Sequence, residues 1–289
     1  MAKEQITGAE ALMRSLEYQG VKTLFGYPGG SIMPTFDALY HHRDTLNHIL
    51  VRHEQGAAHA AQGFARVSGE VGVCLVTSGP GATNLVTGIA TANYDSVPLV
   101  CFTGQVPMNL IGNDAFQEVD IVGITRSICK YAVTVRKRED LARIIKNAFY
   151  IARTGKPGPV LVDIPKDIQL AMGSDEYPDE VNIRGYKPSE GVHSGQLKKA
   201  LAELNRAKKP VFLIGGGVNI AHARKEMQEL CELTGIPVVT TIMGKGAIPT
   251  DHPLYVGNIG MHGNLASNKA IMECDVLFSI GTRFNDRIT

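Results

Sequence analysis

The chain has 289 residues, with 29 Lys and Arg against 28 Asp and Glu, 44% hydrophobic residues and 31 Gly. Its near-zero net charge without a basic block argues against nucleic-acid binding, and no apolar run approaches the roughly 20 residues that cross a bilayer. The N-terminus has no charged-then-apolar leader and none of the five cysteines forms a CxxC pair, so we expect a cytoplasmic protein whose reduced thiols bind no metal.

Residues 1–168 alternate short β-branched runs with stretches of helical period, which is the pattern of a parallel sheet covered by helices on both faces. The clearest helix is predicted at 139–153, because its apolar residues recur on one face and Gly155 follows as a stop. We therefore predict a doubly wound α/β domain over 1–168. Its strands are predicted at 23–27, 48–52, 72–77, 98–104 and 159–165, and its other helices near 8–19, 33–40, 55–67 and 83–93.

The composition becomes polar after Asp167, and we interpret 169–190 as an ordered or semi-ordered linker. A second, partial α/β domain is predicted over 191–289, with Ser194 as the N-cap of its first helix. Because the sequence stops five residues after the last predicted strand, we expect this domain to be truncated. Its strand segments are predicted at 210–218, 236–241 and 275–284, and its helices at 196–207, 221–234 and near 263–274.

Glu54 is the first candidate for chemistry. It follows a continuous apolar strand, at the carboxyl end of which α/β proteins gather ligands. A lone acid in a first helical turn is usually there because the helix dipole favours it. The helix that comes next, however, is rich in residues that solvate a carboxylate poorly and let a backbone or a flat ring approach, which suits a proton-sharing role. These residues are Gly56, Ala57, Ala58, Ala60 and Ala61.

Gly-rich turns come after two strands, GYPGGSIMP at 26–34 and TSGPGATN at 77–84. Such turns can cradle phosphate on backbone amides, but neither the Walker pattern nor GxGxxG is present, so a purely structural turn is an equal alternative. In the polar loop at 111–120, Phe116 and Gln117 could form a substrate wall and a hydrogen-bonding amide, although ordinary packing is favoured. Lys166, just past a strand end, is expected to be solvated.

The second domain has two strand-end loops, GGG at 215–217 and GTRFNDR at 281–287. Arg283 and Arg287 bracket Asn285, a spacing that suits either a phosphate-bearing ligand or an exposed ion-pair cluster. The nine histidines form no HxxxH or HExxH pattern, and no GxSxG occurs. Zinc-enzyme and serine-hydrolase functions are therefore disfavoured.

One enzyme family carries the motifs of this chain in the same order and spacing: GYPGG, RHEQGAAHAAQGFAR, TSGPGATN, FTGQVP, GNDAFQEVDIVGITRS and GKPGPVLVDIPKD. Together they resemble the thiamine-diphosphate-dependent acetohydroxyacid synthases, the acetolactate synthase catalytic subunits, from about residue 4 to the chain end. Glyoxylate carboligase is similar over long stretches but lacks a glutamate at the position of Glu54. The resemblance implies a pyrimidine-binding domain over 1–168, the early part of an FAD-binding central domain over 191–289, and a diphosphate-binding domain that is absent here.

By position, the resemblance implies that Glu54 hydrogen-bonds ring nitrogen N1′ of the aminopyrimidine and so promotes removal of the thiazolium C2 proton. It places Gly30 against the reacting centre, and Phe116, Gln117 and Lys166 at the active-site entrance. Lys156 is an implied flavin contact where many members have arginine; lysine keeps the charge but loses the planar fork. The other implied FAD contacts are Gly215, Gly216, Gly217, Thr241, Ile242, Met243, Met261, His262, Gly263, Asn264, Gly281, Thr282, Arg283, Asn285 and Arg287.

The implied reaction decarboxylates pyruvate and joins the product to pyruvate or 2-oxobutyrate, the first common step of valine, leucine and isoleucine biosynthesis. The implied cofactors are thiamine diphosphate, FAD and Mg²⁺, with the metal ligands in the missing domain. The implied assembly is a homodimer or homotetramer, with a possible regulatory small subunit, so the chain alone is expected to be inactive. The alternatives are a non-catalytic truncated module, and a pyruvate oxidase or 2-oxo-acid decarboxylase of the same superfamily.

Overall fold

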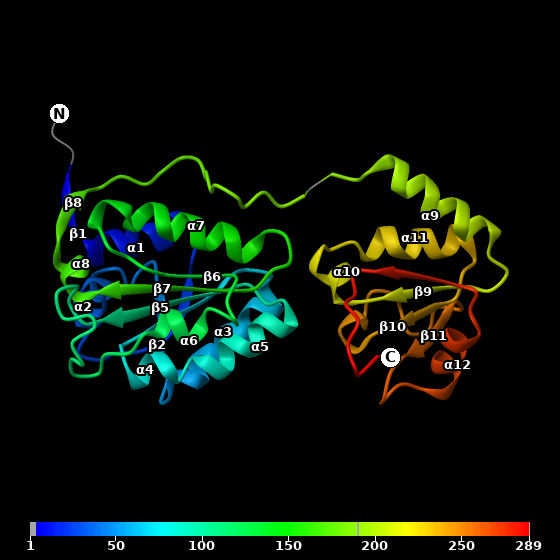
Figure 1. Ribbon diagram of the computed structural model, residues 1–289, viewed down its shortest axis with the longest axis horizontal. Helices are drawn as coiled ribbons and strands as arrows, with labels where there is room; N and C mark the ends of the chain where they lie inside the picture. The colour runs from blue at the N-terminus through cyan, green and yellow to red at the C-terminus, as the bar shows by residue number, and fades with distance from the viewer. Residues whose placement is uncertain (1–3, 190, 289) are drawn as a thin grey trace. The chain divides into compact units, whose positions relative to one another are not determined.

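The computed structural model describes residues 4–189 and 191–288. The described residues up to Ser189 form one compact unit, and those from Gly191 onward form a second. Each unit has helices packed on a parallel sheet (Figure 1), so the predicted α/β class is confirmed. No helix within the described ranges is long and apolar enough to span a membrane.

The first unit is built on a six-stranded parallel sheet with the strand order β3-β2-β4-β5-β7-β6. The order reverses at β2, which has β3 on one side and β4 on the other. Every residue of β4, β5 and β7 is buried, which explains why continuous apolar runs mark these strands in the sequence. The strands are β2 (Thr23–Tyr27), β3 (Asn47–Leu50), β4 (Gly72–Val76), β5 (Leu99–Gln105), β6 (Tyr131–Thr134) and β7 (Pro159–Pro165).

Helices cover both faces of this sheet (Figure 1). One face carries α1 (Gly8–Tyr18), α2 (Met33–His41) and α7 (Leu141–Arg153), and the other carries α3 (Glu54–Ser68), α5 (Val86–Asp95) and α6 (Ile121–Thr125). Successive strand residues alternate between two cores, so that Phe102 joins the core under α1 and α7 while Cys101 joins the core under α3 and α5.

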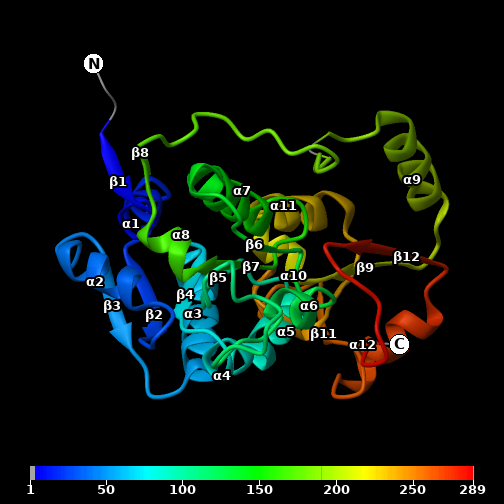
Figure 2. The same cartoon turned by 60° about the vertical axis from the view of Figure 1, so that its left-hand side comes forward.

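The structure corrects the predicted helix at 83–93. That segment is two pieces, α4 (Pro80–Thr83) and α5, because Asn84 and Leu85 separate them. The sequence analysis also missed β6, α8 (Lys166–Leu170), and an antiparallel pair between β1 (Gln5–Thr7) and β8 (Met172–Ser174) that Figure 2 shows at one end of the unit. Elements of three to five residues are too short to show a period.

Part of the predicted linker packs on the first unit, and we call residues 175–188 the strap. The ring of Tyr177 stacks on Tyr18 of α1 with 4.8 Å between ring centroids. The hydroxyl of Tyr186 donates to the Thr154 carbonyl, just beyond α7, at 2.9 Å. Side-chain contacts of this kind hold the strap in place. They are made by single residues, so they produce no helical or strand period in the sequence.

The second unit is built on a four-stranded parallel sheet with the order β11-β10-β9-β12, which reverses at β9. Its strands are β9 (Pro210–Ile214), β10 (Val238–Thr240), β11 (Tyr255–Asn258) and β12 (Val276–Ile280). One face packs against α9 (Ser194–Arg206), α10 (Gly216–Ile220) and α11 (Arg224–Thr234), and the other against α12 (Leu265–Glu273).

Three predictions for the second unit need correction. The N-cap of α9 is His193 and not Ser194, because ring nitrogen Nδ1 of His193 accepts from the Gln196 amide at 3.2 Å. The strand predicted over 210–218 ends at Ile214, since the glycines after it open α10, and the next helix begins only at Arg224. Strand β11 was not predicted.

Candidate functional site

The two Gly-rich turns of the first unit meet where its strand order reverses. Ligands of open α/β sheets bind beyond the carboxyl ends of the strands at such a point. Here β2 and β4 are neighbours, with Tyr27 opposite Val76, so the turns that come after these residues lie side by side. This is the natural place to look for a site in the first unit.

Direct contacts join the two turns. An added Cβ on Gly29 would lie 2.6 Å from the Thr77 side chain, so only glycine fits there. The amide of Ser31 donates to Thr77 Oγ1 at 3.3 Å, and the hydroxyl of Ser78 donates to Ser31 Oγ at 2.8 Å. Gly30 differs, because nothing lies within 4 Å of an added Cβ. Its exposed backbone is open to an approaching group.

Glu54 reaches this region from the edge of the sheet. It is the first residue of α3, is 9% exposed, and follows the N-cap His53, whose ring Nδ1 accepts from the Gln55 amide at 3.1 Å. Its Oε2 accepts from Asn84 Nδ2 at 2.8 Å, and an added Cβ on Gly81 would lie 3.2 Å from its Oε1. A carboxylate that follows β3 therefore contacts the turn after β4, beyond the end of β2.

The small residues of α3 pack mainly inside the first unit. Ala58 and Ala61 are fully buried. Gly88 of α5 lies so close that an added Cβ would be 2.3 Å from the Ala58 Cβ, and Gln62 Nε2 donates to the Gly88 carbonyl at 2.8 Å. The closely approaching backbone is thus that of α5, whereas Gly56 stays exposed with open space around it.

Gln117 and Phe116 lie in the loop 106–120, which touches the turn after β4. An added Cβ on Gly79 would lie 2.6 Å from the Gln117 carbonyl oxygen, and both residues have positive φ angles, 56° and 58°. The ring of Phe116 is 87% exposed, so the packing role favoured from the sequence is wrong for this chain. The loop presents the ring outward beside the Glu54 region.

Lys166 is the first residue of α8, directly after β7. The next residue, Asp167, accepts through Oδ1 from the Met108 amide at 3.2 Å, so this end of α8 adjoins the loop 106–120. Within the loop, the carboxylate of Glu118 accepts from backbone amides, which lower its pKa. Loop and α8 together border the Glu54 region.

The segment 77–84 is the point at which the predicted residues converge. Its last residue, Asn84, contacts Glu54; its first two residues contact the turn that carries Gly30; and Gly79 contacts Gln117. Sequence reasoning missed Asn84, which holds the Glu54 carboxylate, because the helical period runs unbroken through 83–93. The sequence does mark Asn84, because it is the last residue of the TSGPGATN motif. A buried carboxylate among open glycine backbones can share a proton with a ligand nitrogen.

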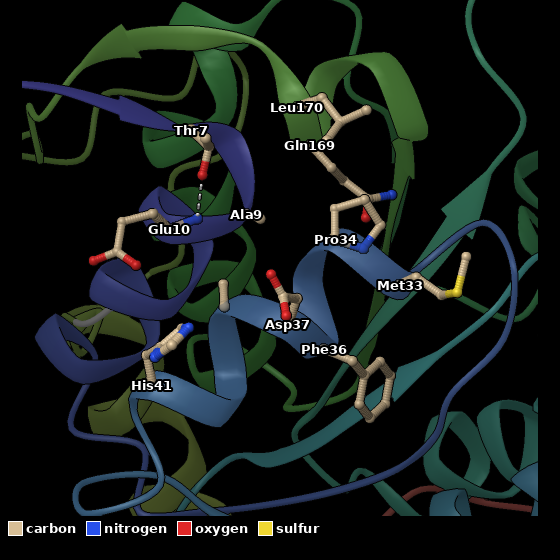
Figure 3. Close-up of a pocket in the computed structure, with 11 residues that line it drawn as sticks. Thr7, Ala9, Glu10, Met33, Pro34, Phe36, Asp37, His41, Gln169 and Leu170 are labelled. Atoms are coloured by element: carbon tan, nitrogen blue, oxygen red, sulfur yellow. Dashed lines mark hydrogen bonds between the residues drawn. The ribbon is translucent and has the colours of Figure 1, made fainter.

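A cleft of about 660 Å³ lies elsewhere in the first unit, between α1, α2 and α8 (Figure 3). Asp37 points into it, whereas the Glu10 carboxylate is turned toward Arg14 and His42. Its lining includes none of the predicted site residues, so it is a feature separate from the Glu54 region. The lining residues are Thr7, Ala9, Glu10, Met33, Pro34, Phe36, Asp37, Ala38, His41, Gln169 and Leu170.

In the second unit, the turns after β9 and β12 touch where the strand order reverses. The Gly217 amide donates to the Gly281 carbonyl at 2.7 Å, and the Gly215 amide donates to the Ile280 carbonyl at 2.9 Å. An added Cβ on Gly215 would lie 2.4 Å from the Gly281 carbonyl oxygen. These glycines are therefore required by the close approach of the two turns at the reversal point.

The loop after β12 folds back on the turn before α12. The Met261 amide donates to the Arg287 carbonyl at 2.9 Å, and the Arg287 guanidinium lies 3.6 Å from the Met261 sulfur. Asn285 Oδ1 accepts from the Arg287 amide at 3.1 Å. Arg283 and Arg287 are both exposed at this end of the sheet. The arrangement presents two cations beside the glycine turns.

Two of the other predicted flavin contacts cap helices. Thr241 Oγ1 accepts from the Gly244 amide at 3.2 Å, at the start of the short helix η2 (Ile242–Gly244). Asn264 caps α12 by accepting from the Ser267 amide at 2.7 Å. Lys156 belongs to the first unit, where its Nζ donates to the Asn93 carbonyl at 2.8 Å. Ile242, Met243, Met261 and His262 are exposed and cap no helix.

Metal-binding side chains do not cluster in the described part of the chain. Over 4–189 and 191–288, no three His, Cys, Asp or Glu side chains gather closely enough to hold an ion. The five cysteines are free thiols, and two of them, Cys74 and Cys101, are opposite one another on β4 and β5.

Both units of this chain match domains of known proteins. Residues 6–124 match the N-terminal TPP binding domain of the thiamine pyrophosphate enzymes, and residues 197–289 match the central domain of these enzymes. A probable acetolactate synthase large subunit of Methanocaldococcus jannaschii is 54% identical over 285 residues, which are 98% of this chain and 48% of that protein.

Two bacterial relatives match to a similar degree. An acetolactate synthase of Mycobacterium bovis is 51% identical over 289 residues, 100% of this chain and 47% of that protein. The acetolactate synthase isozyme 3 large subunit of Escherichia coli K12 is 50% identical over 288 residues, 99% of this chain and 50% of that protein. The chain spans about half the length of the curated relatives it matches.

Proposed function

The chain belongs to the thiamine pyrophosphate enzymes, whose N-terminal and central domains it carries, and on this premise we propose that it forms the pyrimidine-binding part of an acetolactate synthase. The observation that carries the proposal is the buried Glu54 carboxylate at the reversal of strand order, held by Asn84. The relatives named acetolactate synthase support pyruvate as substrate, and we propose pyruvate or 2-oxobutyrate as the acceptor.

The surroundings of Glu54 fit the aminopyrimidine ring of thiamine diphosphate. Asn84 fixes one carboxylate oxygen, and the other lies so close to Gly81 that an added Cβ there would come within 3.2 Å of it. When bound, the cofactor supplies the electron-sink chemistry by which pyruvate loses CO₂. Glu54 would hold a proton at the ring nitrogen, and the open backbone at Gly30 would let the reacting centre approach.

The residues around this carboxylate would orient and admit substrate. Phe116 is exposed and Gln117 packs through its carbonyl on the turn after β4, so the loop that carries them can form one wall of an entrance. Lys166 lies at the start of α8, which adjoins the same loop, and would contribute positive charge toward a 2-oxo acid carboxylate.

A fusion with the other half of a relative tests the proposal. We expect the chain, joined to the C-terminal half of the Methanocaldococcus jannaschii protein, to form acetolactate from pyruvate with thiamine diphosphate, Mg²⁺ and FAD. Glu54→Gln should lower turnover by about 10²–10⁴-fold, because proton placement at the cofactor is lost. Glu70→Gln, an exposed acid just beyond α3, is the matched control and should turn over normally.

Several outcomes would contradict this proposal. Near-normal turnover of the Glu54→Gln fusion would remove Glu54 from the chemistry. Acetate or an aldehyde as the product would favour a pyruvate oxidase or a 2-oxo-acid decarboxylase. A folded fusion without any of these activities would favour the non-catalytic module, and acetolactate formed by the unfused chain would show that it does not need the other half.

We further propose that FAD binds at the strand-order reversal of the second unit. The glycine turns after β9 and β12 pack so closely that an added Cβ on Gly215 or Gly217 would meet the Gly281 backbone, and the exposed Arg283 and Arg287 follow Gly281 in the same loop. Arg287→Ala should weaken FAD binding to the chain about tenfold or more, as expected for a lost charge-assisted contact. Arg206→Ala, an exposed arginine at the end of α9, is the control. Equal FAD affinity in both variants, measured by flavin fluorescence, would contradict the assignment.

Mg²⁺ and the assembly are the remaining parts of the proposal. The described residues do not fit a Mg²⁺ site, since no acidic cluster gathers among them, and we assign the ion no ligand in this chain. A homodimer or homotetramer with a regulatory small subunit would complete the enzyme. Sedimentation of the fusion, with and without such a subunit, tests this part separately.

A further inference from the structure

A buried carboxyl that the proposed chemistry does not use lies in the middle of the first sheet. Asp163 of β7 is 1% exposed. Thr103 Oγ1 donates to its Oδ1 at 2.7 Å, and Thr134 Oγ1 and Gln105 Nε2 donate to its Oδ2 at 3.1 and 3.2 Å. Burying an ionisable group costs free energy unless its hydrogen bonds are made, so three converging donors mark a built site.

Gln105, the last residue of β5, connects this carboxyl to the loop 106–120. Its Oε1 accepts from the Val106 amide at 2.9 Å, where the loop begins. Its Nε2 donates to the Val119 carbonyl at 2.9 Å, where the loop ends, and also to Asp163. The side-chain amide of Gln105 thus hydrogen-bonds to both ends of the loop and to the sheet. Because its oxygen must face a donor and its nitrogen must face acceptors, these three bonds fix the orientation of the amide group.

We propose that Asp163 and Gln105 are positioning residues that fix the loop 106–120, and with it Phe116 and Gln117, against the turn after β4. The inference rests on the proposed function, because that function gives the loop its place at the substrate entrance. Asp163 orients the Gln105 amide, and that amide sets the separation of the two loop ends. The loop then places the Gln117 carbonyl on its neighbouring turn.

The protonation state of Asp163 gives this arrangement a pH signature. Burial, with a smaller contribution from the nearby Asp120 charge, raises its pKa to about 7 against the opposing effect of the three donors. On the same face, the Cys74 contact and burial hold the pKa of Cys101 high, and burial raises that of Cys129 to about 12, so both thiols stay neutral. Helices α7 and α8 pack on the opposite face. Because opening the loop would hydrate Asp163 and lower its pKa, loss of its proton favours opening.

Hydrogen exchange of the full chain tests the proposal, with residues 106–121 as the probe and β4 as the internal reference. Gln105→Met keeps the side-chain length but cannot donate, and should speed exchange of the loop about tenfold or more while β4 is unchanged. Thr134→Val is the matched control: it removes another donor to Asp163 without touching the loop, and should leave loop exchange near that of the wild type.

The pH profile separates positioning from a merely structural role. After correction for intrinsic exchange, protection of the wild-type loop should fall as the pH rises toward about 7, the pKa of Asp163 in the closed loop, and level off above it. In Asp163→Asn the amide oxygen can still accept a hydrogen bond from Gln105, but the side chain has no titrating proton. The fall in loop protection with rising pH should therefore vanish. An unchanged loop in Gln105→Met, equal acceleration of loop and β4, or the wild-type pH profile in Asp163→Asn would overturn the inference. No readout involves acetolactate, so this result and the proposed function can fail independently.

Discussion

The two units use one topology for different purposes. Both sheets are parallel, both reverse their strand order, and both place glycine turns at the reversal. The first unit has the fully buried strand β4 on one side of its reversal and brings Glu54 there, whereas the described part of the second unit buries no carboxyl group and presents arginines. The same architecture can therefore serve proton transfer or anion binding, depending on the side chains at the carboxyl ends of the strands.

Burial distinguishes the central strands of the first sheet from β12, an edge strand of the second sheet, whose strands β9 and β10 are themselves largely buried. The central strands of the first sheet are covered on both faces, so a carboxyl such as Asp163 is removed from water and its pKa rises to about 7. Strand β12 of the second sheet is partly exposed along its length. Side chains on β12 remain solvated. Such an environment suits the binding of a charged ligand better than it suits a shift in the pKa of a proton-transfer group.

The largest expected effect comes from truncating one ring in each sheet. Phe102→Ala in the first unit should lower the free energy of unfolding by about 3–5 kcal/mol, because the ring is fully buried. Phe278→Ala should cost about half as much, since that ring is partly exposed on β12. Urea unfolding followed by hydrogen exchange of peptides from each unit measures both losses. Equal losses would contradict the contrast in burial.

The pH dependence of unfolding should distinguish the units next. The pKa of Asp163 is about 7 in the folded chain against 3.8 for the exposed group, so its contribution to stability is fully present below about pH 4 and is lost as the pH rises to about 7. The slope should approach about 1.36 kcal/mol per pH unit for the first unit. Asp163→Asn should flatten it, and a first unit that gains stability over this range would exclude the raised pKa.

Asn264 tests how far helix capping and flavin binding overlap in the second unit. Asn264→Ala should destabilise that unit by about 1 kcal/mol, because the Ser267 amide loses its acceptor. Asn264→Asp should restore the cap. If FAD affinity falls in the alanine variant and returns with aspartate, Asn264 acts by shaping the turn. A loss of affinity in both variants would instead indicate that the amide itself contacts the flavin.

The smallest effect is expected at the surface of the first unit. Although burial opposes it, hydrogen bonds of the His42 ring nitrogens to the Glu17 and Glu10 carboxylates raise the pKa of His42. The stability from this cluster is therefore present below the usual pKa and is lost as the pH rises through the raised one. His42→Gln should remove about 1 kcal/mol at low pH and less at high pH, measured by urea unfolding. A loss that grows with pH would contradict the sign.

The sequence predicted those features that depend on local pattern. Buried strands such as β4 and β7 appear as apolar runs, and Glu54 was found because it follows such a run. Contacts between residues that are distant in the sequence could not be predicted. Gln105 and Asp163 are 58 residues apart, and no local pattern around either residue indicates their hydrogen bond. The break at Asn84 was missed for a related reason, since a helical period continues across it while a tertiary hydrogen bond decides its conformation.

The pairing of β1 with β8 has a mechanical consequence. Gln5 lies opposite Ser174, so the start of β1 and the end of β8, from which the strap continues, lie at the same end of a short antiparallel ladder. A force that separates these two ends would break the ladder one rung at a time from its open side, with the contact of Arg14 with Asp175 nearby as a first resistance. The six-stranded sheet would stay intact while β1 and β8 separate, so we expect the Glu54 region to be disrupted last.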